Sequence, residues 1–89
     1  MMSKVPISLE KGKRGEVDKE ILRAGIIAEL DAINLYEQMA AMAESRKIKE
    51  VLLDVAKEEK THVGEFQALL LKLDAEQKEE LEKGKREVE

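Results

Sequence analysis

The residues best equipped for chemistry in this sequence are two carboxylates, one imidazole and one phenol. They are Glu29, Glu59, His62 and Tyr36. Glu59 and His62 form a Glu-x-x-His motif, and residues three apart share one face of a helix, where both can bind the same ion. Carboxylate and imidazole ligands without sulfur suit iron or manganese, and ligand type alone does not exclude zinc. The spacing therefore indicates a metal site.

Two long helices, at residues 17–43 and 47–72, are expected to position these side chains. Each carries a stripe of apolar or small residues spaced alternately by four and three, which is typical of helices packed at a shallow angle. The stripes are Leu22, Ile26, Glu29, Ile33, Tyr36, Ala40 and Ala43, and Ile48, Leu52, Val55, Glu59, His62, Phe66, Leu69 and Leu73. The polar members of both stripes are the four residues named above, so the pattern places the chemistry in the seam between the helices.

Capping residues predict where the later helices start. Ser45 can cap the second long helix at its N-terminus. Asp74, followed three residues later by Gln77, is typical of a capping pair that opens a short third helix over residues 75–83. We expect that helix to end near Gly84 and the last five residues to be frayed.

The two carboxylates and the imidazole are expected to converge when the long helices fold back on each other. In an antiparallel hairpin, residues equally far from the turn lie level, and a turn centred near residue 45 puts Glu29 level with Glu59 and His62. That level is roughly 22 Å from the turn at about 1.5 Å per residue. Tyr36 lies two helical turns from Glu29 on the same face.

Two carboxylates in an apolar seam need a counter-charge, because a buried unpaired charge is costly. Neither stripe contains a Lys or an Arg. The counter-charge could come from a protonated His that pairs with one Glu while the other Glu is protonated. A bound metal ion is the simpler explanation.

One chain holds half of a known constellation of ligands. Ferritin-like di-iron bundles take one Glu from each of two helices and Glu-x-x-His from each of the other two. Two copies of this chain would supply that set, and their four Glu would balance two Fe(II) ions. A dimer would also cover apolar side chains outside the seam: Ile27, Leu30, Leu53, Ala56, Val63 and Leu70. We therefore expect an all-α fold, in which an antiparallel two-helix hairpin plus a short C-terminal helix dimerises into a ferritin-like four-helix bundle.

Each of these residues also has a purely structural interpretation. A single His in a helical seam more often packs in a core than binds a metal, and Glu-x-x-His arises easily by chance in a chain rich in Glu. A metal site is favoured because the hairpin would place Glu29 level with Glu59 and His62. For Tyr36, packing beside the site and a catalytic part both remain open, and Met39 and Met42 are expected to fill the core or an interface.

Composition narrows the classes of function. The chain has 16 Lys+Arg against 20 Asp+Glu, a net charge of −4, which argues against a nucleic-acid partner. With no Cys, disulfide scaffolds, zinc knuckles and rubredoxin-type iron sites are excluded.

No apolar run reaches membrane-spanning length and no signal peptide is visible, so a cytoplasmic protein is expected. Residues 1–16, with the only Pro, are expected to form a flexible arm, and residues 17–89 the helical domain.

Two longer segments resemble the encapsulated ferritins, which are truncated ferritin-like proteins held inside encapsulin nanocompartments. The segments are AGIIAELDAINLYEQMA at residues 24–40 and LLDVAKEEKTHVGEFQALLLKLD at residues 52–74. The resemblance implies a homodimer with a ferroxidase centre between its subunits, a ring of dimers that is typically a decamer, and an encapsulin shell protein as partner.

The resemblance also assigns residues. It implies that Glu29, Glu59 and His62 bind the two irons and that Tyr36 lies beside them. Asp31 falls where relatives have a carboxylate on the path by which metal reaches the centre.

The function predicted on these grounds is a ferroxidase that oxidises Fe(II) to Fe(III) at a di-iron centre between two subunits and feeds iron storage in an encapsulin nanocompartment. One alternative is a rubrerythrin-like di-iron protein that reduces peroxide, against which the missing Cys argue. Another is a non-catalytic, metal-binding helical assembly module. The sequence stops at EKGKREVE without a visible shell-targeting peptide, so we expect either that this segment was removed or that the domain is fused to its shell protein.

Overall fold

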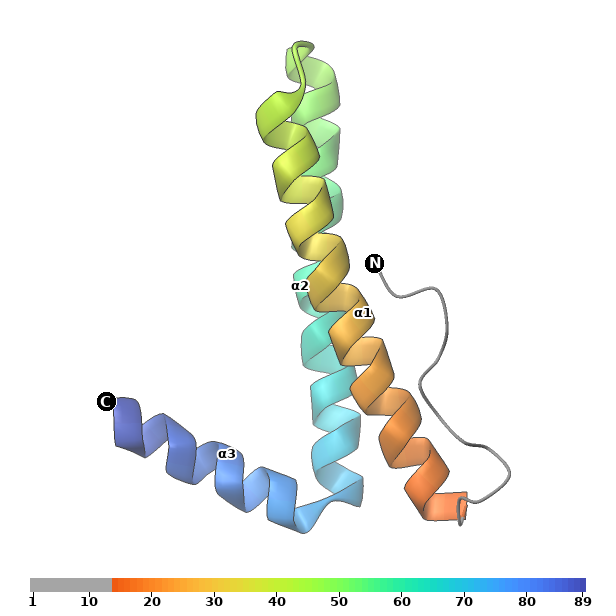
Figure 1. The fold of residues 1–89 in the computed structure, drawn as a ribbon, viewed down its shortest axis with the longest axis vertical. Helices are drawn as coiled ribbons and strands as arrows, with labels where there is room; N and C mark the ends of the chain where they lie inside the picture. The colour runs from red at the N-terminus through yellow and green to blue at the C-terminus, as the bar shows by residue number, and fades with distance from the viewer. Residues whose placement is uncertain (1–13) are drawn as a thin grey trace.

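The fold is an antiparallel helical hairpin with a third helix projecting from its base. The computed structural model describes residues 14–89, which form α1 (Arg14–Met42), α2 (Arg46–Leu73) and α3 (Ala75–Val88). α1 and α2 lie side by side along the hairpin, and α3 turns sharply away from the end opposite the hairpin turn (Figure 1). The predicted all-α class and the predicted hairpin are confirmed.

The helix boundaries differ from the predicted ones at both ends of the chain. α1 begins at Arg14, so the last three residues of the predicted arm are helical, and residues 1–13 lie outside the described part. α3 continues through Gly84 to Val88, so the predicted stop and the frayed end were wrong. A helix interior tolerates one Gly at a cost of about 1 kcal/mol. Basic residues in the last turn of α3 oppose that cost, because they interact favourably with the helix dipole.

Both caps predicted for the later helices are present, whereas Asp18, which the sequence also offers as a cap for the first helix, lies inside α1. The Ser45 side chain accepts a hydrogen bond from the Ile48 backbone N–H at 3.3 Å and so starts α2. Asp74 is the single residue between α2 and α3, and its Oδ1 accepts the Gln77 backbone N–H at 3.0 Å. The backbone N–H groups in the first turn of a helix have no acceptor within the helix, and these two hydrogen bonds satisfy two of them.

The most deeply buried positions of the hairpin are mainly small residues. Within the part of the chain that the structure describes, the buried apolar residues are Ala24, Ile33, Ala40, Ala56 and Leu70. Every member of the first predicted stripe is buried or half-buried. The second stripe holds from Leu52 to Phe66, whereas its end members, Ile48, Leu69 and Leu73, are exposed.

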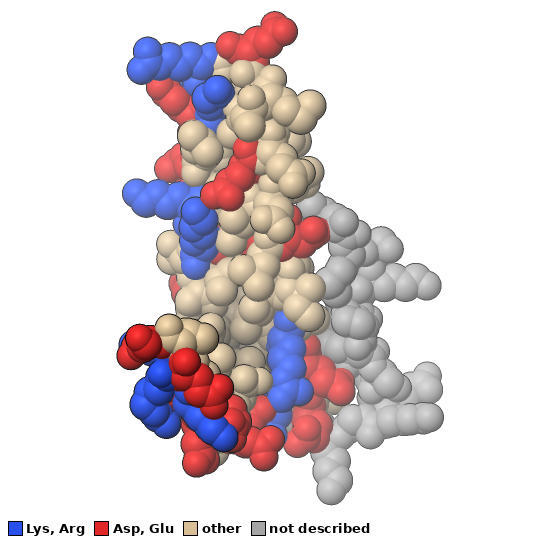
Figure 2. All heavy atoms as spheres, turned by 60° about the vertical axis from the view of Figure 1, so that its left-hand side comes forward, with Lys and Arg blue, Asp and Glu red and all other residues tan. Residues whose placement is uncertain are grey.

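Large apolar side chains remain on the outside of the hairpin. Ile27, Leu30 and Leu53 are each about half exposed, as the sequence predicted for residues that need a partner surface. Ala56 and Leu70 were placed in that group wrongly, because both are buried within the chain. Figure 2 shows a broad band of uncharged residues along one face of the hairpin. Within residues 14–89, no helix is both long and apolar enough to cross a membrane.

Candidate metal centre

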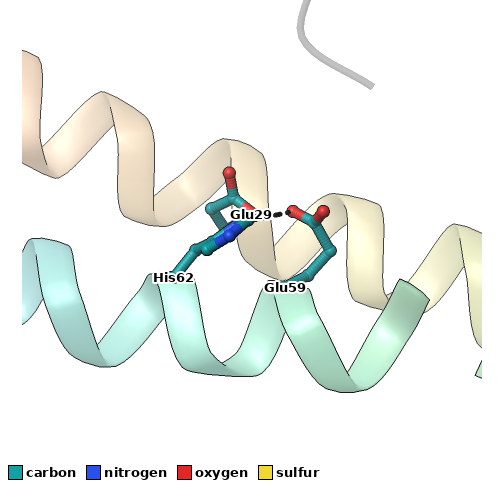
Figure 3. A group of neighbouring side chains, drawn as sticks. All are labelled: Glu29, Glu59 and His62. Atoms are coloured by element: carbon teal, nitrogen blue, oxygen red, sulfur yellow. Dashed lines mark ion pairs between the residues drawn. The ribbon is translucent and has the colours of Figure 1, made fainter. Parts of the chain in front are cut away.

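Three predicted ligands meet between the two long helices. Glu29 comes from α1, and Glu59 and His62 come from successive turns of α2 (Figure 3). Each offers one ligand atom, and these three atoms lie within 4.8 Å of one another. The register expected from the hairpin is therefore present within a single chain.

The distances inside the group suit a shared cation. His62 Nδ1 lies 3.5 Å from Glu29 Oε2 and 3.6 Å from Glu59 Oε2. Donor atoms about 2.1 Å from one ion, at right angles to each other, are about 3.0 Å apart. His62 Nδ1 would thus need to approach each of the two carboxylate oxygens by about half an ångström for one ion to bind it together with either of them. The two carboxylates are mostly shielded, with 19% and 18% of their side-chain surfaces exposed, whereas His62 is 43% exposed.

Glu29 carries a buried oxygen that makes no hydrogen bond. Its Oε2 has less than 1 Å² of accessible surface, and the 3.5 Å contact with His62 lacks hydrogen-bond geometry. A buried acceptor without a donor is costly, and a metal ion is one group that removes the cost. The orphaned oxygen and the all-oxygen-and-nitrogen donor set both fit a divalent metal.

The basic side chain that lies nearest to the ligand group in sequence pairs with another residue. Lys60 lies between Glu59 and His62 in sequence, but its Nζ donates to Glu37 Oε2 at 3.0 Å. Among residues 14–89, neither Glu29 nor Glu59 pairs with a Lys or an Arg. Within the described residues, the ion pairs of these two carboxylates are thus with the imidazole of His62.

Tyr36 and Asp31 are not members of this group. Tyr36 is half-buried on α1, about 10 Å along the helix axis from Glu29 at 1.5 Å per residue. Asp31 is half-buried two residues beyond Glu29, where a helix has turned by more than half a circle. A catalytic part for Tyr36 and a place for Asp31 on a metal path stay predictions.

Comparison with known proteins shows the family of the chain. The family model described as Rubrerythrin matches residues 20–89. The chain belongs to the rubrerythrin family.

One curated relative and one solved structure, both from Pyrococcus furiosus, are similar to this chain. The chain is 60% identical over 82 residues to the ferritin-like–encapsulin shell fusion protein of Pyrococcus furiosus, covering 92% of this chain and 24% of the relative. The chain thus spans about a quarter of the length of that relative. A crystal structure of the encapsulated ferritin domain from Pyrococcus furiosus superposes with a TM-score of 0.84 at 56% identity, covering 99% of this chain and 90% of the other. The resemblance to encapsulated ferritins is confirmed.

Proposed function

We propose that two copies of this chain form a ferroxidase centre that binds Fe(II) as substrate and oxidises it to Fe(III). The observation that carries the proposal is the group of Glu29, Glu59 and His62, in which a buried Glu29 oxygen lacks a hydrogen-bond donor. Membership of the rubrerythrin family supports an iron-related function.

A second copy of the chain would complete the centre. One chain provides two carboxylates and one imidazole, which leaves most positions around two irons unfilled. The exposed apolar face, with Ile27, Leu30 and Leu53, supplies the surface on which two hairpins could pack as a four-helix bundle. Further assembly of dimers into a ring, such as a decamer, is part of the same proposal.

The residues would act mainly by binding and charge. Glu29 and Glu59 would hold the irons, and neutral His62 would supply a nitrogen ligand. Anionic oxygen donors stabilise Fe(III) more than Fe(II), because the higher charge is attracted more strongly. Two Fe(II) ions give up two electrons, which with two protons reduce one oxygen molecule to hydrogen peroxide. Tyr36 is proposed to lie beside the centre in the dimer.

A place inside an encapsulin compartment is a second part of the proposal. The Pyrococcus furiosus relative is named as a fusion of a ferritin-like protein with an encapsulin shell protein. This chain matches about a quarter of that relative. An encapsulin shell is therefore the proposed partner, and the product would be Fe(III) for mineral storage.

Peroxide reduction is the competing enzymatic function, and the family match favours weighing it. The sequence has no Cys, so it contains no cysteine-ligated iron site to carry electrons to the centre. Stopped-flow oxidation of Fe(II) under oxygen and under hydrogen peroxide separates the two functions. We expect oxygen to support multiple turnovers, and a rate that depends on peroxide alone would favour the rival.

A metal-binding module without catalysis would use the same three ligands. Metal analysis of the purified protein, followed by aerobic addition of Fe(II), tests that alternative. We expect iron to bind and to be oxidised faster than in protein-free buffer. Tight zinc or calcium binding without faster iron oxidation would contradict the ferroxidase proposal.

A further inference from the structure

Gly25 on α1 and Phe66 on α2 are in unusually close contact. A Cβ atom built on Gly25 would lie 3.2 Å from Phe66 Cδ2 and 3.3 Å from Phe66 Cε2. Ordinary van der Waals contacts of a Cβ begin at about 3.4 Å, so any side chain here would force the ring or a helix to shift. A Cβ on Gly64 or Gly84 would meet no atom within 4 Å, so the restriction is local to Gly25.

This contact lies one helical turn from the ligand group. Gly25 precedes Glu29 by four residues, and Phe66 follows His62 by four. Residues four apart share a face and are separated by about 6 Å along the axis. Because α1 and α2 are antiparallel, Gly25 and Phe66 both lie farther from the hairpin turn than the ligands do. Their contact is therefore one helical turn from the three ligands shown in Figure 3, on the side away from the hairpin turn.

The separation of the two helices decides whether the ligands can reach one ion. Glu29 is the one member of the group on α1, and 3.5 Å separates its Oε2 from His62 Nδ1 on α2. Metal–ligand distances tolerate changes of only about 0.2 Å. The shift that a Cβ at Gly25 demands is a few tenths of an ångström. Close-packed seams transmit such strain rather than absorb it, and Ile33, buried one turn beyond Glu29, limits movement on the other side.

We propose that the Gly25–Phe66 contact is a spacer that fixes the distance between α1 and α2 at the ligand group and thereby sets its affinity for metal. Gly25 and Phe66 are positioning residues, since neither carries a ligand atom. The inference rests on the proposed function, because it assumes that Glu29, Glu59 and His62 bind a metal ion.

The test is titration of the full-length, metal-free protein with Co(II), which reports binding by its visible absorption and is not consumed by oxygen. Gly25→Ala should lower the affinity for Co(II) about tenfold, as changes to groups that orient ligands do. Gly64→Ala and Gly84→Ala make the same chemical change where a Cβ has free space, and both should bind as wild type does. Equal affinity of Gly25→Ala and these controls would overturn the proposal.

Rescue separates a spacer from general damage to the fold. In Gly25→Ala/Phe66→Val the ring atoms nearest the new methyl group are gone, so we expect affinity to return to within about threefold of wild type, because compensating volume changes are tolerated best. Phe66→Val alone should weaken Co(II) binding with helicity retained by circular dichroism. If Gly25→Ala fails to fold, Phe66→Val decides, and wild-type affinity in that variant would overturn the proposal.

A Glu29→Ala variant in the same titration distinguishes the two proposals. If Glu29→Ala binds Co(II) as wild type does, the metal centre itself is wrong and the spacer falls with it. If Glu29→Ala loses binding while Gly25→Ala keeps it, the centre stands and only the spacer is overturned.

Discussion

Arg23 on α1 lies 2.6 Å from Asp74, the single residue between α2 and α3. The bond joins the Arg23 guanidinium to Asp74 Oδ2, while Asp74 Oδ1 accepts the Gln77 backbone N–H. One carboxylate thus caps α3 and ties its first turn to α1. Figure 1 shows α3 projecting from the hairpin, and Asp74 is the residue at which α3 departs from it.

The junction should loosen in acid. The Gln77 N–H lowers the pKa of Asp74 from its ordinary 3.8, burial opposes that effect, and Arg23 and Lys19 lower the pKa further. A depressed pKa stabilises the fold above the unfolded value, and that contribution is lost as pH falls through the folded value. The protection of amide hydrogens at the start of α3, measured relative to the intrinsic exchange rate at each pH, should therefore fall below pH 3.8. Asp74→Asn keeps a capping side chain and should remove this dependence, and an unchanged pH profile in that variant would contradict the assignment to Asp74.

The small residues of the seam should resist enlargement. Ala56 is 2% exposed between α1 and α2, so Ala56→Leu should destabilise the protein by about 1–3 kcal/mol through overpacking. Ala68→Leu makes the same change at an exposed position of α2 and should stay within about 0.5 kcal/mol of wild type. Guanidinium unfolding followed by circular dichroism measures both. Similar midpoints for the two variants would show that the helices do not pack closely at Ala56.

The exposed apolar face should be needed for dimerisation. Leu30 is 50% exposed, and burying such a side chain stabilises an interface by about 1.5–3 kcal/mol. Leu30→Glu should therefore weaken dimers at least about tenfold. Val88→Glu, at an 86% exposed position at the end of α3, serves as control. Sedimentation velocity measures the effect, and an unchanged mass distribution for Leu30→Glu would place the interface elsewhere.

His62 should matter for metal rather than for folding. Its side chain is 43% exposed and supports no backbone hydrogen bond in the described chain, so His62→Ala should keep its helicity and its melting temperature. Loss of a ligand should lower iron occupancy and oxidation rate at least about tenfold. Iron analysis and oxidation assays on the same samples measure both. If His62→Ala binds and oxidises iron as wild type does, His62 is a packing residue and not a metal ligand.

Much of the fold and of the ligand group could be predicted from the sequence, because both depend on local periodicity. The alternating spacing of four and three residues aligned Glu29 with Glu59 and His62, and Ser45 located the turn. The close contact of Gly25 was missed, since a Gly within a helix resembles a weak breaker until the opposite ring is placed. The sequence signal that would have suggested this contact is a small residue, Gly25, one helical turn before the ligand Glu29.

The ends of the helices were less predictable. Gly84 was taken for a stop, yet α3 continues past it, where Lys85 and Glu89 pair at 3.7 Å one turn apart. Single residues with weak intrinsic preferences are decided by such neighbours. Likewise, Ala56 and Leu70 were expected to contact a partner subunit. Periodicity predicts which face of a helix a residue lies on, but it does not predict how deeply the side chain is buried there.

The most direct test of the central claim is the rate of aerobic Fe(II) oxidation by Glu29→Ala. The matched control is Glu37→Ala, which removes the same carboxylate from the same helix at a position paired with Lys60, outside the ligand group. We predict that Glu29→Ala loses at least about tenfold in rate, as expected when a metal ligand is removed, while Glu37→Ala oxidises iron as wild type does. Equal rates for wild type and Glu29→Ala would contradict a ferroxidase centre built on Glu29, Glu59 and His62.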